Sequence, residues 1–179
     1  MDDPIKQRRS IRRFQDKEIE SEKKEKIFEA ARWAPSWGNL QCVELVVVED
    51  KGMQKQLAAL LAPKNPATRC VALAPVVVAL CGMPIKSGYY RDKQVTRYSS
   101  WFMYDLGIVS QNICLKACEL GLGSVIVGSF DHQQAETLLK IPAGCELVSL
   151  IVLGYPDHIP PTPKRKTVAE FVHYGVYDG

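Results

Sequence analysis

The chain has 179 residues, 46% of them hydrophobic, which is enough to bury the core of one domain. Its 23 Lys and Arg against 20 Asp and Glu leave a formal charge of only +3, too small to predict nucleic-acid or membrane binding through bulk electrostatics. Charged residues stand where a signal peptide would be apolar, and no apolar run reaches membrane-spanning length. We therefore expect a single domain over residues 1–179, located in the cytoplasm.

Residues 8–14 read Arg-Arg-Ser-Ile-Arg-Arg-Phe and place four guanidinium groups and a hydroxyl near the first helical region. Guanidinium groups match phosphate oxygens, and Ile11 and Phe14 would anchor the segment to a core, so this pattern predicts a phosphate site. The alternative is a solvated basic arm, which composition alone favours.

The first half of the chain predicts two helices and two strands. A helix is expected from Glu22 to about Ala34, capped by Ser21 and ended by Pro35. A polar loop over residues 36–41 leads into a strand at 43–48, and a second helix covers 53–61. A Pro-containing connection then leads to an apolar strand at 75–81, which is expected to be buried on both faces.

Residues 82–100 show no clean period and are interpreted as a long irregular excursion, a type of segment that often forms a lid. Its paired Tyr89 and Tyr90 would lie either over a ligand or against a partner subunit. A sustained helical period then predicts a central helix over 101–120, ended by Gly121. Its Asp105 and Asn112 need partners if buried, and we expect them to hold neighbouring backbone or a partner subunit.

The remaining elements are a strand at 124–127, a helix capped by Asp131 that runs through Leu139, and a strand at 147–153. A second basic cluster, residues 164–166, follows a Pro-rich connector. It either grips the same phosphate as residues 8–14 or is a solvated run; spacing leaves both open.

The six cysteines stand among apolar neighbours without paired CxxC spacing, so they are expected to be buried free thiols. Cys114 and Cys118 share a helical face, but no nearby histidine or second cysteine pair completes a site, and we assign no metal.

Four blocks, taken in order, carry a family resemblance: residues 8–14, residues 34–41, the run from Asp105 through Asn112 to the Gly-Leu-Gly at 121–123, and residues 164–166. With these blocks the chain resembles the nitroreductase family of FMN-dependent oxidoreductases over nearly its whole length. The resemblance implies an α+β sandwich with a central, mainly antiparallel sheet flanked by helices. It also implies a homodimer with FMN at the interface.

The same resemblance assigns cofactor-binding positions. Segments at both ends of the chain would hold the flavin phosphate, the ribityl chain and the ring's N1/O2 edge: Arg8, Arg9, Ser10, Arg12, Lys164 and Arg165. A loop from the other subunit would approach the ring and the ribityl group: Ser36, Trp37 and Asn39. A strand end would lie against the ring and offer backbone N–H groups to N5 and O4: Ile126, Val127, Gly128 and Ser129. Many relatives have Glu-Gly where this chain has Gly128-Ser129, so no acidic side chain acts there.

By the same resemblance, hydride passes from NADH or NADPH to flavin N5 and then to a nitroaromatic, a quinone or a similar small acceptor that uses the same site, in ping-pong order. Arg12 would stabilise the charge at N1/O2, and no side chain serves as nucleophile or acid–base catalyst. The alternatives are a specialised flavin enzyme of this fold (a dehalogenase or flavin-fragmenting enzyme), a noncatalytic flavin-binding protein, or a small nucleic-acid-binding protein that uses residues 8–13.

Overall fold

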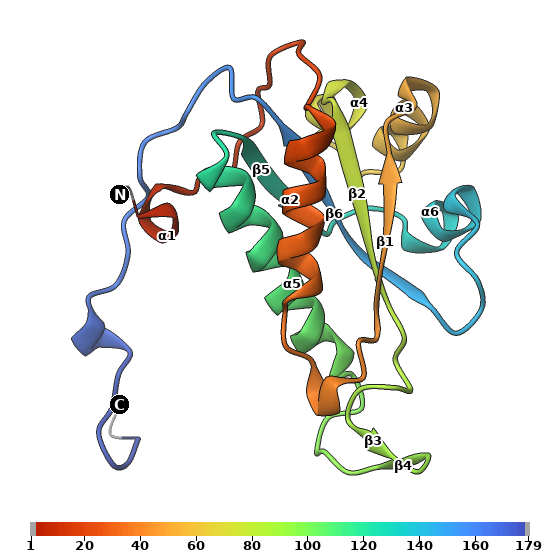
Figure 1. Ribbon diagram of the computed structural model, residues 1–179, viewed down its shortest axis with the longest axis vertical. Coiled ribbons are helices and arrows are strands. Elements are labelled where there is room, and N and C mark those ends of the chain that lie inside the picture. The colour runs from red at the N-terminus through yellow and green to blue at the C-terminus, as the bar shows by residue number, and fades with distance from the viewer. Residues whose placement is uncertain (1–2, 178–179) are drawn as a thin grey trace.

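A four-stranded antiparallel sheet forms the centre of the computed structural model, which describes residues 3–177 (Figure 1). The strand order is β1-β2-β6-β5, with bounds β1 Val43–Val48, β2 Val76–Gly82, β5 Gly123–Val127 and β6 Glu146–Gly154. Every neighbouring pair is antiparallel, from Val43 opposite Gly82 in the first pair to Gly123 opposite Gly154 in the last. The predicted α+β architecture with a mainly antiparallel sheet is confirmed.

Helices cover both faces of this sheet (Figure 1). On one face α2 (Ser21–Arg32) and α5 (Phe102–Glu119) pack on a core that includes Ile27, Leu106 and Ile113. On the other face α3 (Lys51–Ala59), α4 (Thr68–Leu73) and α6 (His132–Leu139) enclose a second core. Because both faces are covered, β2 is buried along its whole length, as its uninterrupted apolar sequence predicted.

Capping side chains explain where two of the helices begin. Asp50 accepts a hydrogen bond from the Met53 N–H over 2.7 Å, so α3 begins two residues before the predicted start. Asp131 caps α6 as predicted. The predicted cap at Ser21 is wrong: Ser21 is the first helical residue of α2, and the preceding Glu20 makes no side-chain capping bond.

Three short elements were missed by the sequence analysis. They are α1 (Pro4–Gln7), α4, and a hairpin of β3 (Tyr89–Tyr90) and β4 (Lys93–Gln94) inside the predicted excursion. A 3-10 turn also forms at η1 (Trp37–Asn39) and another at η2 (Val168–Glu170). These elements are too short to produce a hydrophobic period, and prolines flank α4 on both sides.

The cysteines are all free thiols, four of them buried and two, Cys118 and Cys145, partly buried. Burial raises the pKa of the Cys81 thiol to about 12 and that of Cys42 to about 11. These thiols are therefore protonated at neutral pH, which fits a packing role. Within residues 3–177 no helix combines the length and the apolarity needed to cross a bilayer.

Asn112, on α5, holds the backbone of α2. This confirms the prediction that it bonds neighbouring backbone. Its Nδ2 donates to the Ala30 carbonyl over 2.9 Å. That carbonyl belongs to the last turn of α2, where the helix cannot supply a partner, because the Ala34 N–H bonds Ala31 instead.

We predict that Asn112→Ala lowers the free energy of unfolding by about 1–3 kcal/mol, because it leaves a partly buried carbonyl without a donor. Chemical denaturation measures this value. The control is Gln111→Ala, which removes an exposed amide from the adjacent position and is expected to stay within about 0.5 kcal/mol of the wild type. Equal effects of the two substitutions would contradict the assigned role.

Candidate functional site

The arginine segment, residues 8–14, pairs with the start of β5 and then with the residues that follow β6. Ser10 forms a parallel bridge with Ser124, and the Ile11 N–H donates to the Ser124 carbonyl over 2.9 Å. Successive side chains of an extended segment point to opposite sides, so Ile11 is turned inward and is 3% exposed, whereas Arg12 lies at the surface. The segment is anchored by its apolar residue and is not a free basic arm.

A pair of glycines lets this segment lie close to the sheet. Gly123 and Gly154 face each other across β5 and β6. A Cβ atom at Gly123 would come within 2.7 Å of Ile11 Cγ1, and one at Gly154 within 2.8 Å of Phe14 Cδ1. Any larger residue at either position would displace the arginine segment from the sheet.

Two arginines of the segment remain available for an anion. Arg13 pairs with Asp157, with 2.9 Å between Nη2 and Oδ2, and this pair is solvent-exposed. Within residues 3–177, neither Arg8 nor Arg12 forms an ion pair with a carboxylate. Arg8 and Arg12 stand on either side of Ser10 in the sequence. A phosphate site needs such guanidinium groups that no carboxylate already occupies.

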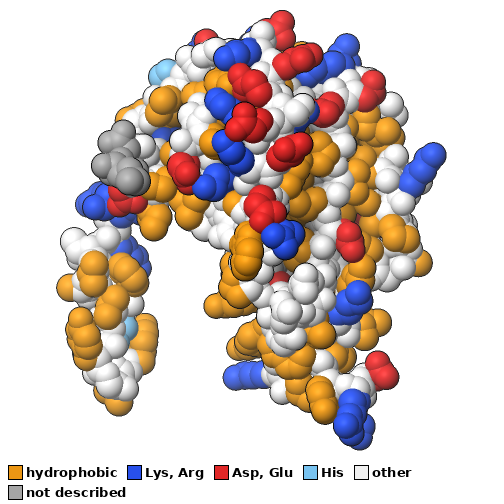
Figure 2. All heavy atoms as spheres, in the orientation of Figure 1, with side chains coloured by type: hydrophobic (Ala, Val, Ile, Leu, Met, Phe, Trp, Pro, Cys, Tyr) orange, Lys and Arg blue, Asp and Glu red, His pale blue; other side chains and the backbone are white. Residues whose placement is uncertain are grey.

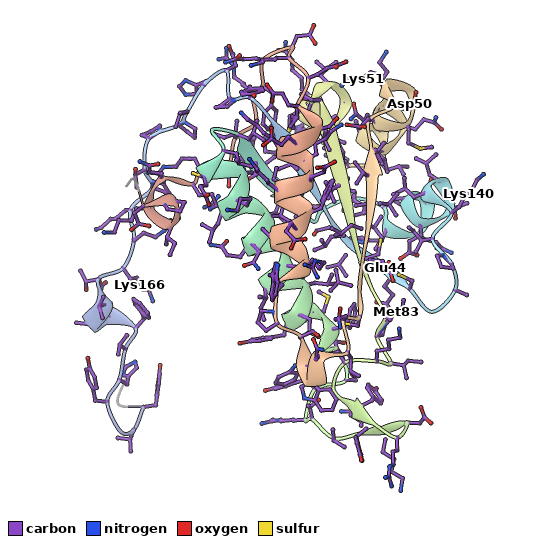
Figure 3. The ribbon with its side chains drawn as sticks, viewed as in Figure 1. Glu44, Asp50, Lys51, Met83, Lys140 and Lys166 are labelled. Atoms are coloured by element: carbon purple, nitrogen blue, oxygen red, sulfur yellow. The ribbon has the colours of Figure 1, made fainter. Side chains whose placement is uncertain are left out.

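The C-terminal segment approaches the arginine segment through Arg9. The Arg9 guanidinium donates to the Thr162 hydroxyl, and it also donates to the Arg8 carbonyl over 2.9 Å. Thr162 comes just before the basic cluster at 164–166, so both basic clusters lie on the same side of the molecule, and Figure 3 shows Lys166 on this segment. Whether Lys164 and Arg165 contact an anion stays a prediction.

Cavities open on both sides of the arginine segment. One, of about 430 Å³, lies between Arg8, Arg9 and the junction from α5 to β5. The other, of about 440 Å³, is lined by Arg12, Arg69 and the end of α4. Arginines from separate elements thus converge on the second cavity, a suitable arrangement for a ligand that carries negative charge.

Arg69 was missed because the sequence analysis treated residues 62–74 as a connection. A helical signal was nevertheless present: Ala67, Cys70, Val71 and Ala74 follow the spacing i, i+3, i+4, i+7, and all four are buried. This period buries one side of α4 and leaves Arg69 exposed at the cavity. Burial raises the pKa of the neighbouring Cys70 thiol to about 11, so this cysteine is no nucleophile at neutral pH.

Gly128 and Ser129 directly follow β5 and are both exposed, although their carbonyls are bonded within the fold. The Ser129 carbonyl accepts from the Ala62 N–H over 3.1 Å and from Asn65 Nδ2 over 3.2 Å. The Gly128 carbonyl lies 3.2 Å from His132 Nε2. Within residues 3–177, neither the Gly128 nor the Ser129 N–H has an acceptor among the hydrogen bonds outside the sheet ladder. Ile126 is half-exposed and Val127 is buried.

The stretch from Leu61 to Arg69 links the two parts of this surface. Leu61 bridges Phe130, Asn65 contacts Ser129, and four residues later Arg69 reaches the cavity of Arg12. This stretch therefore connects the end of β5 to the cavity that Arg12 lines.

The loop with Ser36, Trp37 and Asn39 lies elsewhere. The Trp37 N–H donates over 3.2 Å to Oδ1 of Asp105, in the first turn of α5, whereas the cavity beside Arg8 includes Cys118 near the end of that helix. Thirteen residues of α-helix separate Asp105 from Cys118, about 20 Å along the axis. Within one chain the structure does not bring this loop to the arginine segment (Figure 1).

Asp105 holds this second end of the molecule together. Its carboxylate is 1% exposed and, besides the Trp37 N–H, accepts from Ser87 Oγ over 2.7 Å and from Cys42 Sγ over 3.4 Å. The prediction that Asp105 holds neighbouring backbone is confirmed. One buried carboxylate therefore joins the loop at 36–41 to the base of the excursion at 82–101.

Comparison with known proteins identifies relatives of this chain. The sequence pattern of the nitroreductase family matches residues 5–155. A curated protein of Methanothermobacter thermautotrophicus, provisionally assigned as an NADH dehydrogenase/NAD(P)H nitroreductase, is 32% identical over 162 residues, which are 88% of this chain and 78% of that protein.

Solved structures of the same family have a similar fold. The NADPH:FMN oxidoreductase from Vibrio harveyi, in complex with NAD+, has a TM-score of 0.84 at 28% identity, over 98% of this chain and 77% of that one. An FMN-dependent nitroreductase from Clostridium difficile has a TM-score of 0.82 at 27% identity, over 97% of this chain and 98% of that one. The chain belongs to the nitroreductase family.

Proposed function

We propose that this protein is an FMN-dependent oxidoreductase that takes hydride from NADH or NADPH and delivers it to a nitroaromatic, a quinone or a similar small acceptor, in ping-pong order. The names of its relatives support the donor and the cofactor. The observation that carries the proposal is the anchored arginine segment, in which Arg8 and Arg12 form no ion pair and line separate cavities on either side of the segment.

The hydrogen-bond donors of the arginine segment suit the phosphate of FMN. Arg8 and Ser10 supply a charged fork and a hydroxyl for a phosphate, and Arg9, whose guanidinium bonds Thr162, ties them to the segment that carries Lys164 and Arg165. A guanidinium presents its donors in a planar fork that matches two phosphate oxygens at once, so the set suits a phosphate monoester.

Arg12 and Arg69 have a different role in this proposal. Both line the second cavity, from separate elements, and together they place two permanent charges beside the site. When bound, FMN supplies hydride acceptance at N5 and carries the resulting negative charge at its N1/O2 edge. The two guanidinium groups would stabilise that charge, while the backbone N–H groups of Gly128 and Ser129 orient the opposite edge.

The proposal includes a homodimer, because the two groups of predicted cofactor-binding residues lie at opposite ends of α5. If Ser36, Trp37 and Asn39 act on the same flavin as Arg12, they must come from a second copy. The C-terminal segment also favours a second copy, since Figure 2 shows it standing away from the body with hydrophobic side chains uncovered. Phe171 is 60% exposed and Tyr174 is 90% exposed, unusual for a segment that no partner covers.

The proposed function predicts flavin reduction by the dinucleotide donor. Protein supplemented with FMN and then desalted is expected to keep a visible flavin band, and this band should bleach when NADH or NADPH is added without oxygen. Absorbance spectroscopy measures both effects, with free FMN at the same concentration as the control. A retained band that neither donor bleaches would favour a noncatalytic binding role, and loss of all flavin would contradict the assigned site.

The roles of Arg12 and Arg69 predict a change in cofactor energetics. Each of Arg12→Gln and Arg69→Gln is expected to raise the Kd for FMN about 10- to 100-fold, because each removes a charged donor. Each should also lower the two-electron reduction potential by about 30–60 mV, since the anionic reduced form loses its partner. Fluorescence titration and potentiometry measure these values. Lys55→Gln, an equal loss of charge at an exposed position on α3, should change neither.

Sharing of each site between two chains predicts complementation. Arg12→Gln and Trp37→Ala proteins are each expected to be nearly inactive. Refolded together in equal amounts they should recover about a quarter of wild-type activity, because half of the dimers are mixed and each mixed dimer has one intact site of two. Activity after co-refolding measures this, with each variant refolded alone as the control. No recovery in a sample that contains mixed dimers would place both residues in one chain's site.

A further inference from the structure

Residues 85–98 form an exposed arm that carries the chain's whole excess of positive charge. The arm has four basic side chains, Lys86, Arg91, Lys93 and Arg97, and one acidic one, Asp92, and is therefore +3. The whole chain is also +3, so the remaining residues carry 19 basic and 19 acidic side chains. Within residues 3–177, none of the four cations of the arm pairs with a carboxylate.

Aromatic rings accompany these cations. Tyr90 and Tyr98 are 60% and 62% exposed. The Arg91 guanidinium carbon lies 5.3 Å from the centre of the Tyr90 ring, and that of Arg97 lies 5.6 Å from the Tyr98 ring. Figure 2 shows basic and hydrophobic side chains side by side at this end of the molecule. Stacked arginine and tyrosine pairs bind ligands that combine phosphate groups with a flat base.

The arm has a fixed base and a defined tip. Ser87 is buried and donates to the Asp105 carboxylate, and the Val95 N–H donates to the Gly88 carbonyl over 2.9 Å. Arg91 and Asp92 form the two-residue turn between β3 and β4, both with positive φ (47° and 60°). Because Asp105 also holds Trp37, the arm stands beside the loop that, under the proposed function, reaches the partner's flavin.

We propose that this arm binds the phosphate-bearing adenosine half of the dinucleotide donor, and that it favours NADPH over NADH through the 2′-phosphate. This inference rests on the proposed function. Under the proposed function the dinucleotide donor and the acceptor use the flavin site in turn. Only the donor matches the arm, because it carries a pyrophosphate and an adenine. Simple quinones and nitroaromatics carry no phosphate. The additional 2′-phosphate of NADPH supplies up to two more charges for four unpaired cations.

The test compares the two half-reactions in a triple variant, Arg91→Gln, Lys93→Gln and Arg97→Gln. In a ping-pong enzyme kcat/KM for the donor reports only flavin reduction, and kcat/KM for the acceptor reports only reoxidation. The variant is expected to lose at least about tenfold in kcat/KM for NADPH and clearly less for NADH. Its kcat/KM for an uncharged quinone should not change. The wild-type value for NADPH should also fall with added salt, more steeply than that of the variant.

A binding measurement that needs no turnover completes the test. Adenosine 2′,5′-bisphosphate is expected to bind wild-type holoprotein more tightly than adenosine 5′-monophosphate, and the triple variant should lose this difference. The control variant, Lys26→Gln with Lys55→Gln and Lys140→Gln, removes the same charge from exposed positions on α2, on α3 and after α6, and should behave like the wild type. Figure 3 shows Lys140 at the end of α6, away from the arm.

The outcomes separate this inference from the proposed function. If the triple variant loses donor and quinone rates equally, or loses NADH and NADPH rates equally, donor recognition by the 2′-phosphate is wrong. An unchanged NADPH rate would also overturn it. In each of these cases a wild type that NADPH bleaches keeps the proposed function intact. A wild type that retains flavin but is bleached by neither donor would overturn both.

Discussion

The candidate site depends on one contact, the pairing of the arginine segment with the outer edge of β5. The bond from the Ile11 N–H to Ser124 sets the register, and Gly123 and Gly154 leave the space that Ile11 and Phe14 fill. Burial of these two apolar side chains holds the backbone in place while the intervening arginines remain outside. Hydrophobic packing thereby fixes the positions of the guanidinium groups while they stay in water. Burying the guanidinium groups themselves would add a desolvation free energy of several kcal/mol for each charge.

Helix α5 sets the distance between the two groups of predicted cofactor-binding residues. Its length keeps the arginine segment at one end and the loop at 36–41 at the other, and buried Asp105 ties that loop to the base of the arm. A rigid helix of this length cannot bring its own two ends together. Under the proposed function, a ligand that needs both ends would lie between two copies of the chain, so the binding site and the proposed dimer rest on the same geometry.

The chemistry of the described residues is that of binding and electrostatics. Burial raises the pKa values of Cys42, Cys70 and Cys81 to about 11–12, so these thiols remain protonated at neutral pH, and the arginines offer hydrogen-bond donors and charge. Such groups can position a cofactor and stabilise charge on it. This suits a protein whose reactive centre belongs to a bound flavin, and the arm extends the same principle to the anionic donor.

The sequence by itself determined the strands and the long helices, because apolar period, capping residues and alternation act over a few neighbouring positions. For the arginine segment it left two alternatives, an anchored phosphate site and a solvated basic arm, and the bridge to Ser124 decided for anchoring. The sequence also placed Asp105 and Asn112 as polar residues that need partners. Only the tertiary structure decided that α4 brings Arg69 beside Arg12 and that Asp105 joins Trp37 to Ser87. It also separated the loop at 36–41 from the arginine segment by most of the length of α5. These relations join residues far apart in the chain, and their distances depend on how whole helices pack on the sheet, which no local pattern encodes.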